Sequence, residues 1–74
     1  MKIGIGKWPL PLKYGIEAYQ LPDGFWSVRN VTKHGIVSFP FIVAQTAREC
    51  IGTANNCDIG VDRLRYADGR IEEL

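Results

Sequence analysis

Apolar and polar residues alternate over much of residues 1–39, and this period of two is typical of β-strands. The alternation in Lys2–Trp8 predicts a short first strand. Pro9 and Pro11 follow, and they exclude a helix or a central strand there because proline lacks the backbone N–H group. Beyond them the pattern predicts a meander of three antiparallel strands, at Tyr14–Leu21, Phe25–Val31 and Ile36–Phe39.

Two turns separate the strands of this meander. In Pro22-Asp23-Gly24 the proline presets φ, the aspartate bonds the local backbone and the glycine takes a positive φ, which together suit a tight hairpin loop. Thr32–Gly35 is predicted as the second turn, again with its glycine at positive φ.

The adjacent aromatic residues Phe25 and Trp26 begin the second strand of the meander and point to opposite faces of the sheet. A three-residue loop before them places Trp26 on the face of Ala18 and Val28, and a two-residue loop reverses the partners. The sequence leaves both registers open. In either register both faces carry apolar residues, so we expect one face to be covered by a helix. The other face is covered by the terminal segments or by another molecule.

After Pro40 the period of the apolar residues changes to that of a helix. The change predicts an amphipathic helix over about Phe41–Ala54, with Gly52 costing it about 1 kcal/mol relative to alanine. Its apolar positions are expected to be buried against the sheet, with Arg48 facing outward: Val43, Ala47, Cys50, Ile51 and Ala54.

The C-terminal residues predict a terminal hairpin around Asp68-Gly69. A two-residue loop there would set Tyr66 opposite Ile71 and Arg65 opposite Glu72. A short helix over Val61–Tyr66 is the alternative, and the sequence leaves it open.

These elements form a single compact α+β domain over residues 1–74, in the order β-βββ-α-ββ. We expect a small antiparallel sheet, made of the three-stranded meander and the terminal strands, with one amphipathic helix packed on one face. The composition, 46% hydrophobic and 23% charged, is that of an ordinary globular protein. No secretory signal and no membrane-spanning stretch is evident, so a cytoplasmic protein is expected.

The sequence does not favour an enzyme. His34 is the one histidine, and it falls in a predicted turn without a neighbouring carboxylate. Cys50 and Cys57 are too few for a disulfide framework and lack the spacing of a metal site, so we expect both thiols to be reduced and catalytically idle. Gly4-Ile5-Gly6 lacks the rest of a phosphate-binding loop. No cofactor and no metal are expected.

A nucleic-acid-binding module is one functional hypothesis, because basic residues such as Lys13, Arg29 and Lys33 share the N-terminal half with aromatic residues. The stretch YGIEAYQLPDGFWSV (Tyr14–Val28) in this order of elements resembles the AP2-type fold of plant transcription factors and of phage integrase arm-binding domains. That resemblance implies DNA binding through the sheet. Those domains carry several outward arginines, whereas this sequence offers mainly Arg29, and its net charge is only +1.

The preferred hypothesis is a small non-enzymatic protein-binding module, such as an accessory, inhibitor or adaptor protein. Stand-alone domains of this size are typical of phages and other mobile elements. Aromatic residues and arginine carry much of the binding energy at protein interfaces, and homodimerisation is the simplest way to cover such a surface. The predicted partner-binding residues are Trp8, Tyr19, Phe25, Trp26, Arg29 and Lys33.

Overall fold

The computed structural model describes residues 14–74. The strand predicted at Lys2–Trp8, the proline-containing connector after it and the candidate binding residue Trp8 lie outside the described residues. Residues 14–74 contain all the helices, strands and contacts described for this structure.

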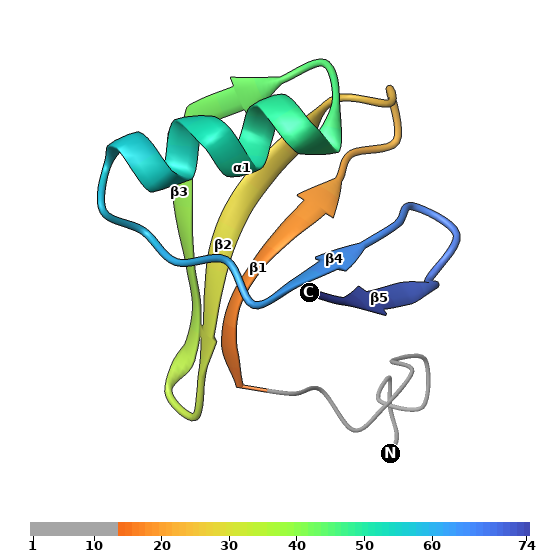
Figure 1. Cartoon of the computed structure of the whole chain (residues 1–74). Coiled ribbons are helices and arrows are strands. Elements are labelled where there is room, and N and C mark those ends of the chain that lie inside the picture. The colour runs from red at the N-terminus through yellow and green to blue at the C-terminus, as the bar shows by residue number, and fades with distance from the viewer. Residues whose placement is uncertain (1–13) are drawn as a thin grey trace.

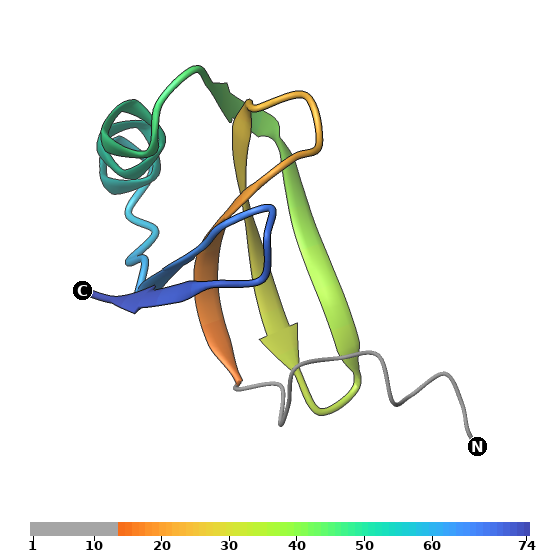
Figure 2. The same ribbon diagram turned by 90° about the vertical axis from the view of Figure 1, so that its right-hand side faces the viewer.

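Five strands form one sheet, and one helix lies across one of its faces (Figures 1 and 2). The strand order in the sheet is β3-β2-β1-β4-β5. The α+β class, the meander and the single helix on one face are confirmed. The elements are β1 (Gly15–Gln20), β2 (Trp26–Thr32), β3 (Gly35–Ala44), α1 (Ala47–Asn56), β4 (Arg63–Arg65) and β5 (Ile71–Glu73).

The sheet is mixed, and the expectation of a purely antiparallel sheet is wrong. Strands β1, β2 and β3 form the antiparallel meander, but β4 pairs in parallel with β1. The chain leaves β3 at one edge, passes through α1 and returns on the far side of β1 (Figure 1). Parallel strands require a crossover connection, and the segment that contains α1 provides it here. The local sequence pattern does not specify which strand of the sheet β4 pairs with after this crossover.

The loop between β1 and β2 contains three residues, Pro22–Gly24, which fixes the register of the first hairpin. The Leu21 N–H donates to the Phe25 carbonyl at 2.7 Å and the Gly24 N–H donates to the Leu21 carbonyl at 2.9 Å. Gly24 has φ +95°, as predicted for the residue that closes this loop. Trp26 therefore lies on the helix side of the sheet, where it is buried, and Phe25 is exposed.

The predicted start of the helix at Phe41 is wrong, since α1 begins at Ala47. Residues 41–44 instead continue β3 along β2 after a bulge, because Val28 pairs with Phe39 whereas Ser27 pairs with Val43. The Ser27 hydroxyl donates to the Ile42 carbonyl at 2.7 Å within this bulge. Val43, predicted to be buried in the helix, is 56% exposed on the strand.

Thr46 determines where α1 begins. Its backbone is extended, and its hydroxyl oxygen accepts the Glu49 N–H at 3.1 Å. From Ala47 onward the predicted period is confirmed, because Cys50 and Ala54 are fully buried and Arg48 is exposed. Ala47 and Ile51, also predicted to be buried, are only half-buried where they pack against the core. The buried core between α1 and the sheet consists of Ala18, Trp26, Val28, Ile42, Cys50, Ala54 and Leu64.

The terminal hairpin is confirmed, and the alternative helix over Val61–Tyr66 is wrong. Its predicted register is also wrong, because the loop holds three residues, Ala67–Gly69, and is closed by the Tyr66 N–H donating to the Arg70 carbonyl at 2.8 Å. Arg65 consequently lies opposite Ile71 instead of opposite Glu72. The three-residue loop with glycine at positive φ repeats the geometry of the first hairpin.

Candidate protein-binding surface

The face of the sheet away from α1 carries a cluster of buried charges centred on Glu17. The Glu17 carboxylate accepts hydrogen bonds from the Nε atoms of Arg29 at 2.7 Å, Arg63 at 2.9 Å and Arg65 at 3.1 Å. The side chains of Glu17 and Arg63 are fully buried, and those of Arg65 and Arg29 are 9% and 16% exposed. We call these four residues the Glu17 cluster.

The pairing of three strands assembles the Glu17 cluster. Glu17 on β1 lies opposite Arg29 on β2 and opposite Arg63 on β4, and Arg65 lies two residues further along β4 on the same face. The sequence reasoning selected Arg29 but missed the other three residues. The alternation Arg63-Leu64-Arg65 indicates a strand with two arginines on one face. Their shared partner depends on the parallel pairing of β4 with β1.

The contacts of the Glu17 cluster indicate that it has a structural role in holding the strands together. Burial raises the pKa of Glu17, but hydrogen bonds and positive charge from Arg29 and Arg65 outweigh it, so the net pKa lies below the ordinary value of 4.5. Glu17 is therefore a carboxylate at neutral pH and ties β1 to β2 and β4. The Nη2 atom of Arg65 is buried without a hydrogen-bond partner, so one donor of the cluster is unsatisfied.

Strand β3 has the opposite character, because it exposes apolar side chains at the edge of the sheet. None of its ten residues is charged. Natural edge strands are commonly protected by charged residues, by proline or by bulges, and β3 has only Pro40 and the bulge beside it. Four of its large side chains are between 41% and 68% exposed, namely those of Ile36, Val37, Phe41 and Val43.

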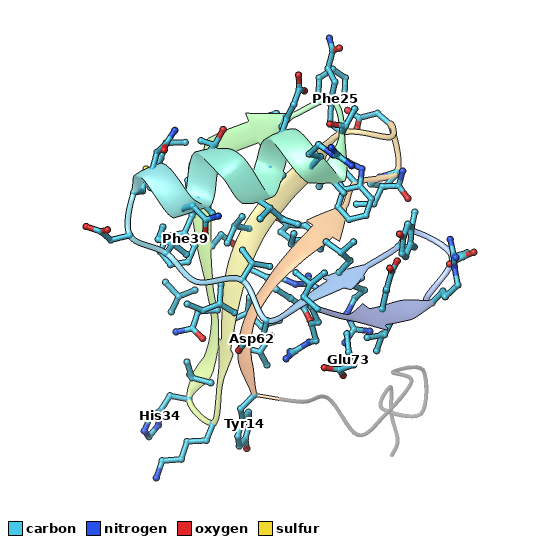
Figure 3. All side chains as sticks on the ribbon, viewed as in Figure 1. Tyr14, Phe25, His34, Phe39, Asp62 and Glu73 are labelled. Carbon is cyan, nitrogen blue, oxygen red and sulfur yellow. The ribbon has the colours of Figure 1, made fainter. Side chains whose placement is uncertain are left out.

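An open groove adjoins the C-terminal end of β3 and runs along α1. Gly52 lines this groove, and apart from the backbone of its own helix nothing lies within 4 Å of the position that a Cβ would occupy there. Glu49 is the single charged residue of its lining, which consists of Phe25, Val43, Ala44, Gln45, Glu49, Gly52, Thr53 and Asn56. Phe25 and His34 mark opposite ends of the sheet in Figure 3, so the groove and the β2–β3 turn lie at opposite ends of β3.

The predicted partner-binding residues do not form one surface. Trp26 packs edge-on against Tyr66 in the core, with ring centroids 5.2 Å apart. Tyr19 is half-buried under the Arg29 guanidinium, whose carbon lies 4.3 Å from the ring centroid.

The remaining two described candidates are more accessible. Phe25 is 39% exposed at the groove. Lys33 is exposed in the turn between β2 and β3. The exposed residues of β3 were not selected from the sequence, because residues 41–44 were assigned to a helix.

Side chains that could support catalysis or metal binding are dispersed. Cys50 is buried, and burial raises the pKa of its thiol, whereas Cys57 is exposed. Within residues 14–74, no group of three or more His, Cys, Asp or Glu side chains could hold a metal ion. In the same residues no helix has the length and apolar character needed to cross a bilayer.

No protein-family model, curated protein or solved structure matches the chain.

Proposed function

We propose that this protein is a small, non-enzymatic protein-binding module that binds its partner through the exposed edge of β3. The observation that carries the proposal is the uncharged, ten-residue edge strand with four exposed apolar side chains. An edge strand presents unpaired backbone N–H and C=O groups, and another strand can add to it with main-chain hydrogen bonds.

The arrangement of the other charged and aromatic residues supports this proposal. The Arg29 guanidinium is engaged by Glu17 and Tyr19, and Arg63 and Arg65 point to the same carboxylate. A surface that binds nucleic acid presents its cations to phosphate groups. The apolar edge of β3 is therefore the better candidate for recognition than the charged face.

A photo-crosslinking residue at Phe41 tests the proposal. Benzoylphenylalanine at this position resembles the native side chain, which is 68% exposed, and should crosslink a protein in cells that produce the chain. The matched control carries the same residue at Tyr14, which is 64% exposed outside β3. The crosslinked partner is then purified and titrated against the wild type, Val37→Lys on β3 and Ile71→Lys on the opposite edge strand.

We expect a direct complex that Val37→Lys weakens at least tenfold and that Ile71→Lys leaves unchanged. A complex that tolerates Val37→Lys would contradict binding through β3. Parallel titrations with single- and double-stranded oligonucleotides address the nucleic-acid hypothesis. Salt-sensitive oligonucleotide binding that Arg29→Ala abolishes would overturn the proposed function.

A further inference from the structure

We propose that the Glu17 cluster binds one small carboxylate ion between the guanidinium groups of Arg29 and Arg65. This site is separate from the proposed function, because the cluster lies on the face of the sheet away from α1 and does not include the β3 edge. Buried charged groups in folded proteins are normally paired and hydrogen-bonded. The charges, the hydrogen bonds and the exposure of these two arginines depart from that rule in a way that an anion would correct.

The first observation is that Arg29 and Arg65 share one carboxylate. Their Nε atoms both donate to the same oxygen, Oε2 of Glu17, at 2.7 and 3.1 Å. Within residues 14–74 neither guanidinium group forms an ion pair with another carboxylate. The two arginines and Glu17 therefore carry a surplus of one positive charge, which a monoanion would neutralise. Burial strengthens the attraction, because the effective dielectric constant is lower there than in water.

Arg63 is not part of the anion site, because other carboxylates lie near it. Glu73 lies opposite Arg63 on β5. Asp62 is also close, since a Cβ added to Gly15 would lie 2.8 Å from Asp62 Oδ2 and 3.2 Å from Arg63 Nη1. The side chain of Arg63 is also fully buried. The surplus charge is therefore assigned to the other two arginines.

The second observation is the unsatisfied donor of Arg65. Its Nη2 atom is buried without a hydrogen-bond partner, and the side chain as a whole is 9% exposed. A buried donor without an acceptor destabilises the fold, so an acceptor that binds there removes that cost. Because Nη2 is enclosed, we expect the Arg65 guanidinium to turn toward the anion when it binds, as interface side chains commonly do.

The third observation is the access to Arg29, whose side chain is 16% exposed. Its hydrogen bond to Glu17 uses Nε, which leaves the Nη atoms for a ligand. Tyr19 covers one face of the guanidinium, at 4.3 Å from the ring centroid, so a ligand approaches in the guanidinium plane. A carboxylate binds in that plane through two parallel hydrogen bonds. The small exposed area restricts the ligand to a small organic acid.

Acetate is a suitable probe, because it is a small carboxylate with one negative charge. The Nε–Hε signals of the nitrogen-15-labelled full chain are followed by NMR at neutral pH, while acetate replaces chloride at constant ionic strength. We expect the signals of Arg29 and Arg65 to shift along a saturating curve with a millimolar dissociation constant. Arg48 is exposed on α1 and serves as the internal control, whose signal should show no saturating shift.

Two matched substitutions test the location of the site. Arg29→Gln removes the surplus charge, because Arg65 and Glu17 then neutralise each other, and should weaken acetate binding at least tenfold. Arg48→Gln removes the same charge from α1 and should leave the affinity unchanged. Circular dichroism checks that both variants are folded. Should Arg29→Gln unfold, Arg29→Lys keeps the charge but loses the planar fork and should still weaken binding roughly threefold or more.

Binding to the folded chain also stabilises it by mass action. At an acetate concentration of ten times the dissociation constant, the equilibrium constant for unfolding should fall about elevenfold in the wild type. The same acetate concentration should lower it only about twofold in Arg29→Gln, whose affinity is tenfold weaker. Urea titrations in acetate and in chloride at equal ionic strength measure both values.

The proposal is overturned by signals of Arg29 and Arg65 that shift without saturation, by an equal saturating shift at Arg48, or by a folded Arg29→Gln variant that binds acetate as tightly as the wild type. Inorganic phosphate at the same ionic strength tests the class of anion. Phosphate that binds more tightly than acetate would contradict a site for a single carboxylate. None of these outcomes bears on the proposed function, which is tested at β3.

Discussion

The Glu17 cluster and strand β3 occupy the same sheet and reverse the usual distribution of side chains. The cluster buries the carboxylate of Glu17 and the guanidinium groups of Arg63 and Arg65 near the middle of the sheet, with Arg29 half-buried beside them. Strand β3, two strands away from β1, exposes apolar side chains at the edge. Charged residues are rarely buried unless they are paired, and large exposed apolar patches commonly mark interaction sites.

The difference indicates that the Glu17 cluster stabilises the folded chain, whereas β3 is the region that we propose binds a partner. Each arginine of the cluster bonds the carboxylate on β1, so β2 and β4 are held in one register relative to β1. The exposed side chains of β3 make no comparable contribution within the protomer. We therefore expect substitutions in the cluster to affect folding and substitutions on the β3 edge to affect association.

Glu17→Gln should have the largest effect on the free energy of unfolding. Removing one partner of a buried ion pair costs about 3–5 kcal/mol, because the remaining charges stay buried without compensation. The core of so small a domain supplies only about 3–5 kcal/mol of net stability. We expect a largely unfolded variant by circular dichroism.

The same substitution at Glu72 is the control for this prediction, because its carboxylate is exposed and accepts a hydrogen bond from the Tyr66 hydroxyl that an amide can also accept. Glu72→Gln should change the stability by less than about 0.5 kcal/mol. Equal free energies of unfolding of the two variants in urea titrations would show that the Glu17 cluster does not stabilise the sheet.

Acidification should reproduce part of the Glu17→Gln effect in the wild type. The folded pKa of Glu17 is lowered, so its contribution is complete above the unfolded value of about 4.5 and is lost as the pH falls through the folded pKa. Urea titrations at decreasing pH should show stability declining below that value. Glu17→Gln, measured with a stabilising osmolyte, should show a smaller decline, and an equal decline in both proteins would assign the acid sensitivity to other carboxylates.

Two glycines should respond to alanine in opposite directions. Gly24 closes the β1–β2 loop at φ +95°, so Gly24→Ala should destabilise by about 1 kcal/mol. Gly52 lies in α1 beside the β3 groove with open space around it, so Gly52→Ala should stabilise by about 0.5–1 kcal/mol. Thermal unfolding of both variants measures the signs. A neutral Gly24→Ala would contradict the loop geometry.

Much of the fold could be predicted from local patterns, and the exceptions have physical causes. The first hairpin loop followed from Pro22, Asp23 and Gly24, since each residue type suits one position of that turn. The start of the helix was wrong because the apolar residues 41–44 fit both a helix face and an edge strand. The signal for the true start was the sequence from Thr46 to Glu49, which matches a capping box.

The candidate surface was less predictable, because it depends on which strands become neighbours. The aromatic pair suggested binding through Phe25 or Trp26, but the hairpin register buries Trp26. The exposure of β3 follows from its place at the edge, and the Glu17 cluster follows from parallel pairing with a strand 46 residues away in sequence at Arg63. The local pattern of apolar and polar residues specifies neither the edge position of β3 nor the pairing of β4 with β1.

Amide hydrogen exchange of residues 35–44, followed with and without the partner purified by crosslinking at Phe41, tests most directly the proposal that a protein partner binds the β3 edge. The backbone groups of an edge strand that face solvent exchange rapidly, and pairing with another strand protects them. We predict that exchange in β3 slows when the partner is bound, while exchange in β1 stays constant. Exchange in β3 that the bound partner leaves unchanged, or protection that develops only in another segment, would contradict binding through β3.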